Sequence, residues 1–326
     1  MSRRRVRPMA LVLAGGLTLL LGSAAIAAPV GALKQFKVPT ANSEPRAITN
    51  GSDGNRWFTE GTSFTNAPPK IARIMPAGAV TEIPVDCNGC ILTDIIQGPG
   101  NVLYFTSNDP FLGRYNWQTG TFLTAIDIPD SNAVAGDLAV HGDDIWFTDF
   151  NNDSLWRYNT TAGQFTQFTV PEPSDAVVDA AGDVWFTAPL AGSIERLDPA
   201  TGAVEAFPVA DGLIPRQITI ATDGQIWFTS RFVPQGVGRL DPATGVVTPF
   251  PTPSNPGPEG IAASPDGTVW FTQTTKGNIA RIDNAGVITE TKAVKGSEPF
   301  GITVSPNGDP WYTMFAASKI ATLELR

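Results

Sequence analysis

Histidine and cysteine, the usual ligands of structural zinc, are scarce in this chain. Its 326 residues include one histidine and two cysteines. A structural zinc site needs four ligands, and His141 is far in sequence from Cys87 and Cys90. The scarcity therefore excludes a zinc site. The Cys-Asn-Gly-Cys spacing instead predicts a local disulfide between Cys87 and Cys90 in an oxidising compartment, because a turn is expected there rather than the helix of a thioredoxin-like site.

Positive charge is also in short supply. Lysine and arginine number 22 against 31 aspartates and glutamates, which gives a formal net charge of −9. The first seven residues already hold four of the arginines, Arg3, Arg4, Arg5 and Arg7, so the rest of the chain is more acidic still. An acidic surface repels phosphate groups. Nucleic acids and anionic membranes are therefore excluded as partners.

The first 28 residues have the pattern of a signal peptide. The arginines are followed by an apolar run over residues 10–26 and by Ala25-Ile26-Ala27, a small-x-small cleavage site. No cysteine follows the run, which excludes a bacterial lipoprotein anchor, and no cationic cluster follows it, which disfavours a retained membrane anchor. We expect residues 1–28 to be removed and the mature protein to be secreted or periplasmic, free of the membrane. The paired arginines leave twin-arginine export open.

A tripeptide of two aromatic residues and threonine, usually Trp-Phe-Thr, recurs along the rest of the chain. Its seven copies begin at Trp57, Tyr104, Trp146, Trp185, Trp227, Trp270 and Trp311. Successive copies start 39 to 47 residues apart, and a period of about 40–45 residues with strand-like content is typical of β-propellers. The sequence therefore predicts an all-β, seven-bladed β-propeller of four-stranded antiparallel blades. Residues 29–326 form it as one domain.

The sixth repeat indicates how a blade is built. Turn residues such as Asp266-Gly267 divide it into four short segments, because Asp-Gly adopts the positive φ angles of a hairpin turn at little cost. Val269, Trp270 and Phe271 are apolar in succession, which predicts burial on both faces of that strand between neighbouring blades. The aromatic residues of the repeat are therefore assigned to the core rather than to a ligand site.

An arginine stands in the third strand of six repeats. These arginines are Arg73, Arg114, Arg157, Arg196, Arg239 and Arg281. A residue repeated in nearly every blade is expected to be structural and to pair with carboxylates or turn carbonyls between blades.

The two ends of the chain are expected to close the ring. The last repeat supplies only three strands, whereas residues 33–39 match the fourth strand of the third repeat. We therefore expect the N-terminal strand to pair with the last blade, which removes two exposed sheet edges.

Two positions in each blade are expected to reach the mouth of the central channel. One precedes the first strand and the other follows the aromatic tripeptide, and both vary from blade to blade. Variable residues on a constant frame are where a specific site is built. The predicted ligand-binding residues are Arg46, Glu60, Asp149, Arg216, Arg231, Glu259, Gln273 and Phe300. Their cations and carboxylates favour a pocket for a polar or anionic small molecule or for a peptide segment, and the alternative is a water-filled mouth without a ligand.

The motifs Pro-x-Gly-Ile, Asp-Gly-x-Val-Trp-Phe-Thr and Ile-Ala-Arg-Ile-Asp resemble those of the virginiamycin B lyase (streptogramin lyase) family over essentially the whole mature chain. The resemblance implies a seven-bladed propeller. It also implies an enzyme that opens the ring of type B streptogramins at an ester by elimination, with a magnesium ion, a histidine base and glutamates.

The family's functional residues match this chain only in part. In the last blade the family has Glu-x-His before the first strand and a glutamate after the aromatic tripeptide. Glu298 matches the first glutamate, whereas Phe300 stands at the histidine and Met314 at the second glutamate. In the preceding blade, Glu259 stands at another histidine of the family and Gln273 at another glutamate. The catalytic candidates are therefore Glu259 and Glu298.

These departures favour a monomeric, non-lyase member of the family that binds a ligand or partner on its channel face without a cofactor. One alternative is a divergent C–O lyase for cyclic ester antibiotics, which would keep Mg²⁺ if a lyase-like site survives. A second is a lactonase-like hydrolase with a divalent metal held by carboxylates from Glu60, Asp149, Glu259 and Glu298. A third is a structural module of the cell surface.

Overall fold

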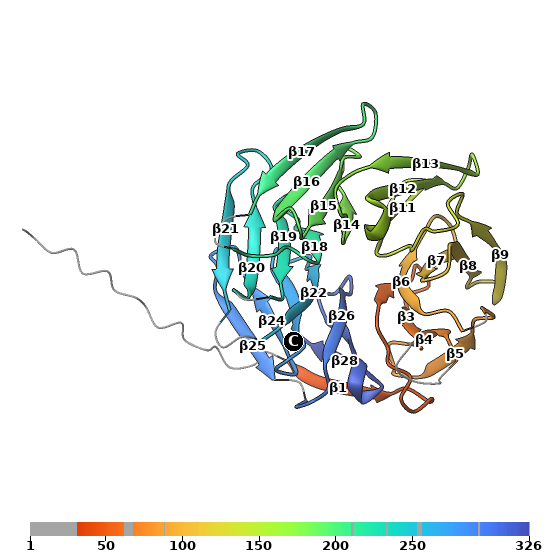
Figure 1. Ribbon diagram of the computed structural model, residues 1–326. Helices are drawn as coiled ribbons and strands as arrows, with labels where there is room; N and C mark the ends of the chain where they lie inside the picture. Colours follow the sequence, from red (N-terminus) through yellow and green to blue (C-terminus); the bar gives the residue numbers. More distant parts are fainter. Residues whose placement is uncertain are drawn as a thin grey trace, which may run out of the picture.

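The computed structural model describes residues 31–61, 68–87, 89–209, 212–232, 234–252, 256–292 and 294–325. Over these residues the chain forms seven four-stranded antiparallel sheets that are arranged as the blades of a ring (Figure 1). The predicted all-β, seven-bladed propeller is therefore confirmed. The predicted signal peptide, residues 1–28, lies outside the described residues. Within the described ranges, no helix is long and apolar enough to cross a membrane.

Six blades are built from four strands that are consecutive in sequence. Blade 1 comprises β2 (Ile48–Asn50), β3 (Arg56–Glu60), β4 (Lys70–Ile74) and β5 (Val80–Pro84), and blade 2 comprises β6 (Leu92–Gln97), β7 (Val102–Ser107), β8 (Phe111–Asn116) and β9 (Thr121–Asp127). Blade 3 comprises β10 (Leu138–His141), β11 (Asp144–Asp149), β12 (Ser154–Asn159) and β13 (Gln164–Thr169), and blade 4 comprises β14 (Ala176–Val178), β15 (Val184–Ala188), β16 (Ser193–Asp198) and β17 (Ala203–Pro208). Blade 5 comprises β18 (Ile218–Ile220), β19 (Ile226–Ser230), β20 (Gly236–Leu240) and β21 (Val247–Pro251), and blade 6 comprises β22 (Pro258–Ala263), β23 (Val269–Gln273), β24 (Asn278–Ile282) and β25 (Ile288–Lys292). Short 3-10 turns follow β11 and β27, at η1 (Phe150–Asn152) and η2 (Phe315–Ala317).

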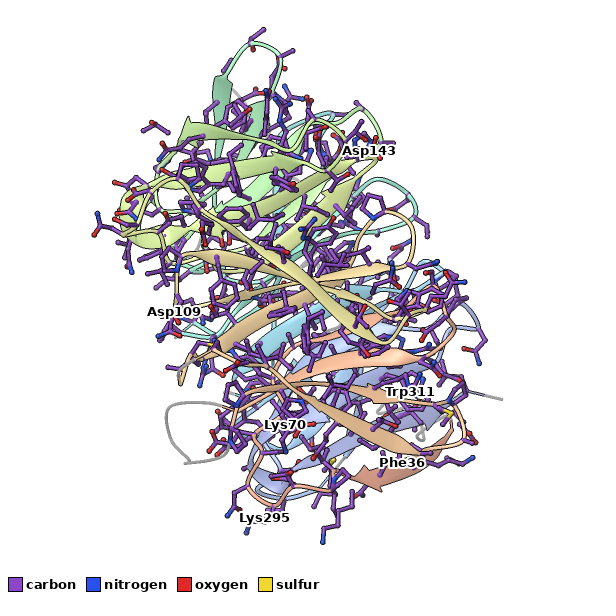
Figure 2. The ribbon with its side chains drawn as sticks, turned by 90° about the vertical axis from the view of Figure 1, so that its right-hand side faces the viewer. Phe36, Lys70, Asp109, Asp143, Lys295 and Trp311 are labelled. Carbon is purple, nitrogen blue, oxygen red and sulfur yellow. A yellow bond between two sulfur atoms is a disulfide. The ribbon has the colours of Figure 1, made fainter. Side chains whose placement is uncertain are left out.

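Blade 7 combines both ends of the described chain. Its strands are β26 (Pro299–Val304), β27 (Pro310–Met314), β28 (Lys319–Glu324) and β1 (Ala32–Lys37), and β1 pairs antiparallel with β28. Phe36 of β1 stacks on Trp311 of β27, with ring centroids 5.7 Å apart and planes 10° from parallel (Figure 2). The predicted closure of the ring by the N-terminal strand is therefore confirmed.

The aromatic tripeptides form the core, as predicted. Their first two residues are buried in every blade. The third-strand arginines lie across the sheet from them, with Arg73 5.7 Å from the ring centroid of Trp57 and Arg239 5.5 Å from that of Trp227. The expected bond between blades is found for Arg239, which donates to the backbone oxygen of Asn284. The prediction is incomplete for Arg73, Arg157 and Arg196, because the antiparallel register places these guanidinium groups on a tryptophan of their own blade. Arg114 instead donates to the backbone oxygen of Thr124 in its own blade.

The threonine of the tripeptide links neighbouring blades at the channel. In blade 5, Thr229 Oγ1 accepts the backbone N–H of Gln217 in its own blade and donates to the backbone oxygen of Glu259 in the next blade. Thr187 repeats the arrangement between blades 4 and 5, and Thr272 between blades 6 and 7. The repeated threonine thus fixes the backbone of the channel-lining residues, which are the variable ones.

Candidate ligand site in the central channel

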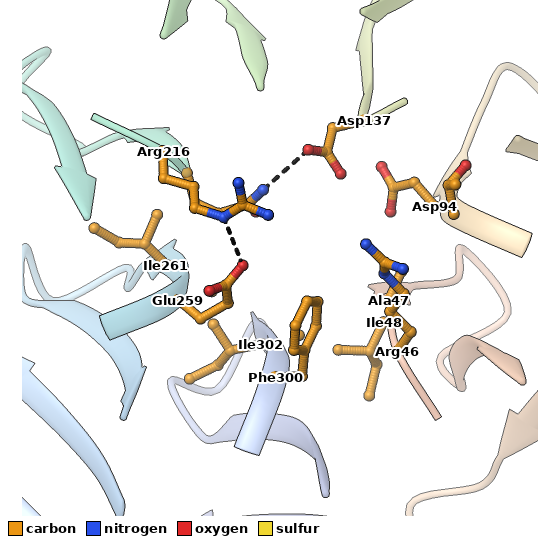
Figure 3. A pocket seen from close by; sticks show the side chains of 14 residues that line it. Arg46, Ala47, Ile48, Asp94, Asp137, Arg216, Glu259, Ile261, Phe300 and Ile302 are labelled. Carbon is orange, nitrogen blue, oxygen red and sulfur yellow. Dashed lines mark hydrogen bonds and ion pairs between the residues drawn. The ribbon is translucent and has the colours of Figure 1, made fainter. Parts of the chain in front are cut away.

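A cavity of about 100 Å³ lies in the central channel (Figure 3). Residues in or just before the first strands of six blades line it, and they include four of the predicted ligand-binding residues, Arg46, Arg216, Glu259 and Phe300. The side chains of Arg46 and Arg216 reach into the cavity from opposite walls. A ring of inner strands thus brings together residues that are up to 256 positions apart in the sequence, Arg46 and Ile302.

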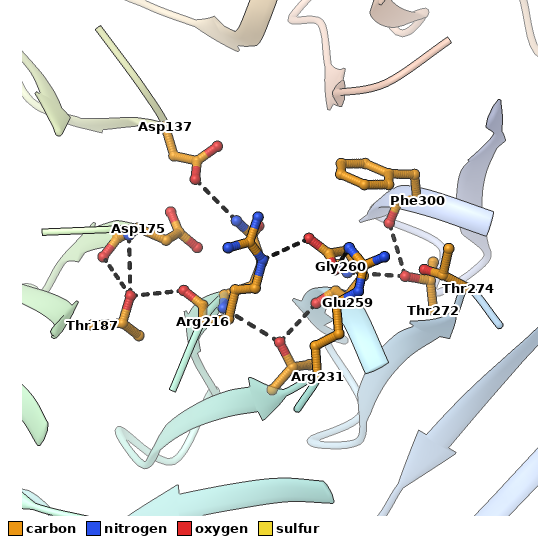
Figure 4. Close-up of polar contacts among 12 residues, drawn as sticks. Asp137, Asp175, Thr187, Arg216, Arg231, Glu259, Gly260, Thr272, Thr274 and Phe300 are labelled. Carbon is orange, nitrogen blue, oxygen red and sulfur yellow. Dashed lines mark hydrogen bonds and ion pairs between the residues drawn. The ribbon is translucent and has the colours of Figure 1, made fainter. Parts of the chain in front are cut away.

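Glu259 is held between two arginines at one wall of the cavity (Figure 4). Arg216 Nε donates to Glu259 Oε1 at 2.9 Å, and Arg231 Nη1 donates to Glu259 Oε2 at 2.8 Å. The carboxylate is buried, whereas both arginines are about one-third exposed. Both oxygens of Glu259 are thereby engaged, so the carboxylate is an anchor for two cations rather than a free base.

Arg46 has a different environment at the opposite wall. Its guanidinium carbon lies 5.2 Å from the ring centroid of Phe300, a cation–π arrangement. Its side chain has no ion pair or hydrogen bond with another residue in the part of the chain that the structure describes. Stacking leaves the edge of a guanidinium, which carries the N–H donors, available to a ligand.

Three aspartates that the sequence analysis did not select line the other side of the channel. They stand in the inner region of blades 2, 3 and 4. Asp94 Oδ2 accepts the backbone N–H of Leu138 at 2.7 Å, and Asp175 Oδ2 accepts that of Ile218 at 2.8 Å. Asp137 Oδ2 accepts a hydrogen bond from the side chain of Gln217, in blade 5, at 2.9 Å. These carboxyl groups tie neighbouring or facing blades together across the channel.

The three carboxyl groups are held in a low-dielectric environment that disfavours their charge. Burial, together with the neighbouring charge of Asp137, raises the pKa of Asp94 to about 7. Burial raises the pKa of Asp137, although the charges of Arg46 and Arg216 oppose the shift. Burial and the charge of Asp137 raise the pKa of Asp175 well above its ordinary value. At pH 7 the Asp94 carboxyl is therefore about half protonated, whereas a carboxyl in water is charged.

An apolar depression adjoins the charged cavity. It has a volume of about 570 Å³ and shares Thr93, Asp137 and Arg216 with the cavity as lining residues. Its other walls include apolar side chains from the loops after β11, β15 and β19: Phe150, Leu190 and Phe232. These are 40%, 73% and 54% exposed, which is unusual for large apolar residues and indicates an interaction surface.

The structure places the remaining predicted site residues away from the cavity. Glu60, Asp149 and Gln273 are the last residues of second strands and are fully buried between blades. Asp149 accepts from the backbone N–H of Val134, and Gln273 donates to Glu290. The ligand-binding role of these three residues stays a prediction, but none of them lines the cavity.

The two catalytic candidates are separated as well. Glu259 is buried in its double ion pair, whereas Glu298 is exposed, with a φ of 48°, before β26. Its charge adds to the burial that raises the pKa of Glu44, the corresponding residue before blade 1. Cys87 and Cys90, in the segment between blades 1 and 2, are joined by a disulfide.

The comparisons with known proteins agree with this architecture. The sequence profile described as the virginiamycin B lyase family matches residues 25–174 and 112–326. The chain belongs to the virginiamycin B lyase family. No curated protein sequence matches it significantly.

Solved structures of family members superpose on nearly the whole chain. A streptogramin B lyase is 27% identical, with a TM-score of 0.82 over 91% of this chain and 98% of the other. Virginiamycin B lyase from Staphylococcus aureus is 24% identical, with a TM-score of 0.80 over 90% of this chain and 99% of the other. An extracellular domain of a putative two-component system from B. thetaiotaomicron, 12% identical with a TM-score of 0.71, shares the fold over 90% of this chain and 40% of the other.

The residues present do not fit the magnesium site that the family resemblance implies. Met314, which the resemblance matches to a glutamate of the family, is a fully buried thioether, and Mg²⁺ requires oxygen ligands. Among the described residues, no three histidine, cysteine, aspartate or glutamate side chains are grouped so that they could hold a metal ion. We therefore derive no catalytic step through a metal.

Proposed function

We propose that this family member binds a small ligand with an anionic head group in the central cavity and does not open ring esters. The observation that supports this most is the guanidinium of Arg46, which is stacked on Phe300 and forms no ion pair or hydrogen bond with a carboxylate among the described residues. Its charge acts on Asp94 and Asp137 only beyond ion-pair distance. The planar guanidinium presents donors that match two oxygens of a carboxylate or phosphonate. The half-buried ring of Phe300 holds the guanidinium in position.

The neighbouring carboxyl groups support an anion rather than a cation as the ligand. Burial raises the pKa of Asp94 to about 7 and also raises the pKa values of Asp137 and Asp175. A protonated carboxyl donates a hydrogen bond to an anionic oxygen. Arg216 adds a second guanidinium group. The single carboxylate of Glu259 pairs with both Arg216 and Arg231, so these three side chains together carry a net positive charge.

The volumes of the cavity and of the apolar depression indicate which part of the ligand each of them holds. A cavity of about 100 Å³ accommodates a head group, whereas pockets for whole drug-sized ligands have about 300–1,000 Å³. The adjoining depression of about 570 Å³ offers Phe150, Leu190 and Phe232 to an apolar body. We therefore expect the head group between Arg46 and Arg216 and the rest of the ligand over the loops of blades 3, 4 and 5.

Calorimetric titration with probes of equal shape and different charge tests this proposal. Benzoate and phenylphosphonate should bind, and neutral benzamide should bind much more weakly. Because a hydrogen bond to a charged group contributes about 1.5–3 kcal/mol, Arg46→Gln should weaken the binding of phenylphosphonate about tenfold to hundredfold. Arg239→Gln, which removes an arginine stacked on Trp227 far from the cavity, is the matched control and should leave the affinity unchanged. Equal binding of benzoate and benzamide would refute the anion site.

The absence of ring opening has its own support. The place of the family's histidine base is taken by Phe300, which accepts no proton, and Glu259 has both oxygens in ion pairs with Arg216 and Arg231. Loss of a general base typically lowers a rate about 10²–10⁴-fold. Incubation with quinupristin and Mg²⁺ should therefore yield no linear product by mass spectrometry above the protein-free control. Linear product that disappears in Glu259→Gln would establish a divergent lyase instead.

Export of the protein is proposed from the sequence of residues 1–28, whose arginines, apolar run and small-x-small site have the pattern of a signal peptide. N-terminal sequencing of secreted protein should find a start near Ala28 or Pro29. A start at Met1 or Ser2 on exported protein would contradict this proposal.

A further inference from the structure

The outer flank of blade 2 carries a second cavity, of about 430 Å³, away from the channel. It lies where the pairing of β8 and β9 is irregular. Leu112 pairs with Ile126 and Arg114 with Leu123, so β9 has one extra residue opposite Gly113. Such a bulge bends a strand away from its partner. Only glycine fits at position 113, because a Cβ there would stand 2.1 Å from the ring of Phe105.

Aromatic rings form the apolar wall of this cavity. Phe105 meets Phe111 at a centroid distance of 6.4 Å and Phe122 at 6.2 Å, and both pairs are close to perpendicular. Phe105 is buried, whereas Phe122 is 40% exposed. Edge-to-face packing leaves ring faces pointing in different directions, and the face of a ring is the negative end of its quadrupole.

Negative charge predominates among the lining residues. Asp86, Asp109 and Asp127 contribute three carboxylates, and Arg114 contributes the one cation among the lining side chains. The guanidinium of Arg114 is directed to its own blade, where Nε and Nη2 donate to the backbone oxygen of Thr124 at 3.0 and 2.6 Å. In Figure 2, Asp109 lies at the edge of the molecule, where a solute can approach it.

A covalent bond holds the remaining wall in place. Cys87 lines the cavity and is joined to Cys90 by the disulfide. A wall that is fixed before binding lowers the conformational entropy lost when a ligand is ordered. The short disulfide loop, which has no counterpart in the other blades, thus stands where blade 2 departs from the repeat.

We propose that this cavity is a binding site for a small organic cation with an apolar body, such as an aromatic amine or a quaternary ammonium compound. The rings attract the cation and cover its apolar part, and the carboxylates at the rim exclude anions of the same shape. The site is independent of the proposed anion site, because the two share no residue.

Titration calorimetry with benzyltrimethylammonium, neutral benzyl alcohol and benzoate tests the proposal. The cation should bind with saturation and at least about tenfold more tightly than benzyl alcohol, the range expected for a cation–π contact with partial desolvation. Failure of the cation to saturate at millimolar concentration would overturn the proposal, and so would equal binding of the three probes.

A cavity-filling variant locates the site. Ala125 is exposed and lines the cavity, so Ala125→Trp should fill it and abolish binding of the cation without disturbing the core. Ala206 faces the corresponding third-strand position in blade 4 and is also exposed, so Ala206→Trp is the matched control and should bind normally. Asp109→Asn should weaken the cation about threefold and leave benzyl alcohol unchanged. Cation binding that survives in Ala125→Trp would overturn the assignment.

Discussion

The two sides of the channel are built on the same repeat but join their blades in different ways. On blades 2 and 4, aspartate side chains (Asp94, Asp175) accept backbone N–H groups of the next blade. On blades 6 and 7, the corresponding positions are Gly260 and Gly301, and the backbones approach directly. The backbone N–H of Gly301 donates to the backbone oxygen of Arg46 at 3.1 Å.

Because of this difference, the residues that stabilise the ring and the residues that would bind a ligand lie on different sides of the channel. Where an aspartate joins the blades, the variable residue beside it is small, Thr93 or Ser174, and the aspartate itself is committed to the neighbouring backbone. Where glycine lets the backbones join, the neighbouring residues Arg46, Glu259 and Phe300 are free to point into the cavity. We therefore expect substitutions on the aspartate side to change stability, and substitutions of cavity residues on the glycine side to change ligand affinity.

The buried carboxyl of Glu60, which accepts no backbone N–H among the described residues, provides the strongest contrast with Asp175. Burial, with the charge of Glu82, raises the pKa of Glu60 to about 8, against the opposing charge of Lys70 and the nearby Ser43 hydroxyl. Among the described residues, neither carboxyl oxygen is in a well-formed hydrogen bond. The protonated form is favoured in the folded state, so its contribution to stability is complete below about pH 4.5 and is lost as pH rises to about 8. Glu60→Gln should therefore be more stable than the parent at pH 8, on the order of 3 kcal/mol, and should gain little at pH 5. Urea denaturation at both pH values measures this, and a gain that is equal at both would contradict it.

The glycine side can be tested by adding a single methyl group. A Cβ on Gly260 would stand 2.4 Å from the backbone oxygen of Phe300. Because backbone cannot yield as a flexible side chain does, Gly260→Ala should lower the free energy of unfolding by about 2–3 kcal/mol. Ala47 occupies the corresponding position of blade 1 with its Cβ accommodated, and Ala47→Gly, the reverse change, should cost less than about 1 kcal/mol. Chemical denaturation of both variants measures these free energies. An unchanged free energy of unfolding in Gly260→Ala would contradict the direct approach of the two backbones.

The aspartate side can be tested by removing its acceptors. Asp175 Oδ1 and Oδ2 accept the backbone N–H groups of Ala176 and Ile218. Asp175→Ala leaves both donors without a partner and should cost about 2 kcal/mol, because relief from a buried carboxyl offsets part of the loss. Asp175→Asn keeps one acceptor oxygen but turns its NH2 group toward the second N–H donor, so it should cost about half as much, about 1 kcal/mol. If both variants lose the same stability, the hydrogen bonds are not the reason for the aspartate.

A smaller effect links the two sides. As pH rises through about 7, the pKa to which burial and the charge of Asp137 raise Asp94, this carboxyl becomes negative beside the head group. The affinity for phenylphosphonate should therefore fall a few-fold between pH 6 and pH 8, by about 1 kcal/mol or less. Benzoate, whose own charge is constant in this range, gives the cleaner titration. Asp94→Asn should remove most of the dependence, and an unchanged slope in that variant would assign it to another group.

Most of the fold could be predicted from the sequence because the motif of one blade recurs in seven repeats. The recurring tripeptide gave the number of blades, and the match between residues 33–39 and an internal fourth strand gave the closure of the ring by β1. The role of the repeated threonine in linking blades could not be predicted, because a hydrogen bond such as that from Thr229 to Glu259 joins residues 30 positions apart.

The candidate site could be predicted only in part, for two geometric reasons. Residues after the tripeptide, such as Glu60 and Gln273, still belong to the second strand and are enclosed between blades. The first strands contain irregularities, between Leu92 and Ile95 for example, so that two successive residues face the channel rather than one. Asp94 was missed for that reason. Its signal in the sequence is an aspartate in three successive repeats where Gly260 and Gly301 stand in the last two.

A crystal structure of the mature protein grown with phenylphosphonate tests the central claim most directly. The account predicts phosphonate oxygens within hydrogen-bond distance of the Arg46 guanidinium and the phenyl ring over the apolar depression near Phe232. A phosphonate bound elsewhere on the protein, with the cavity between Arg46 and Arg216 free of it, would contradict the account.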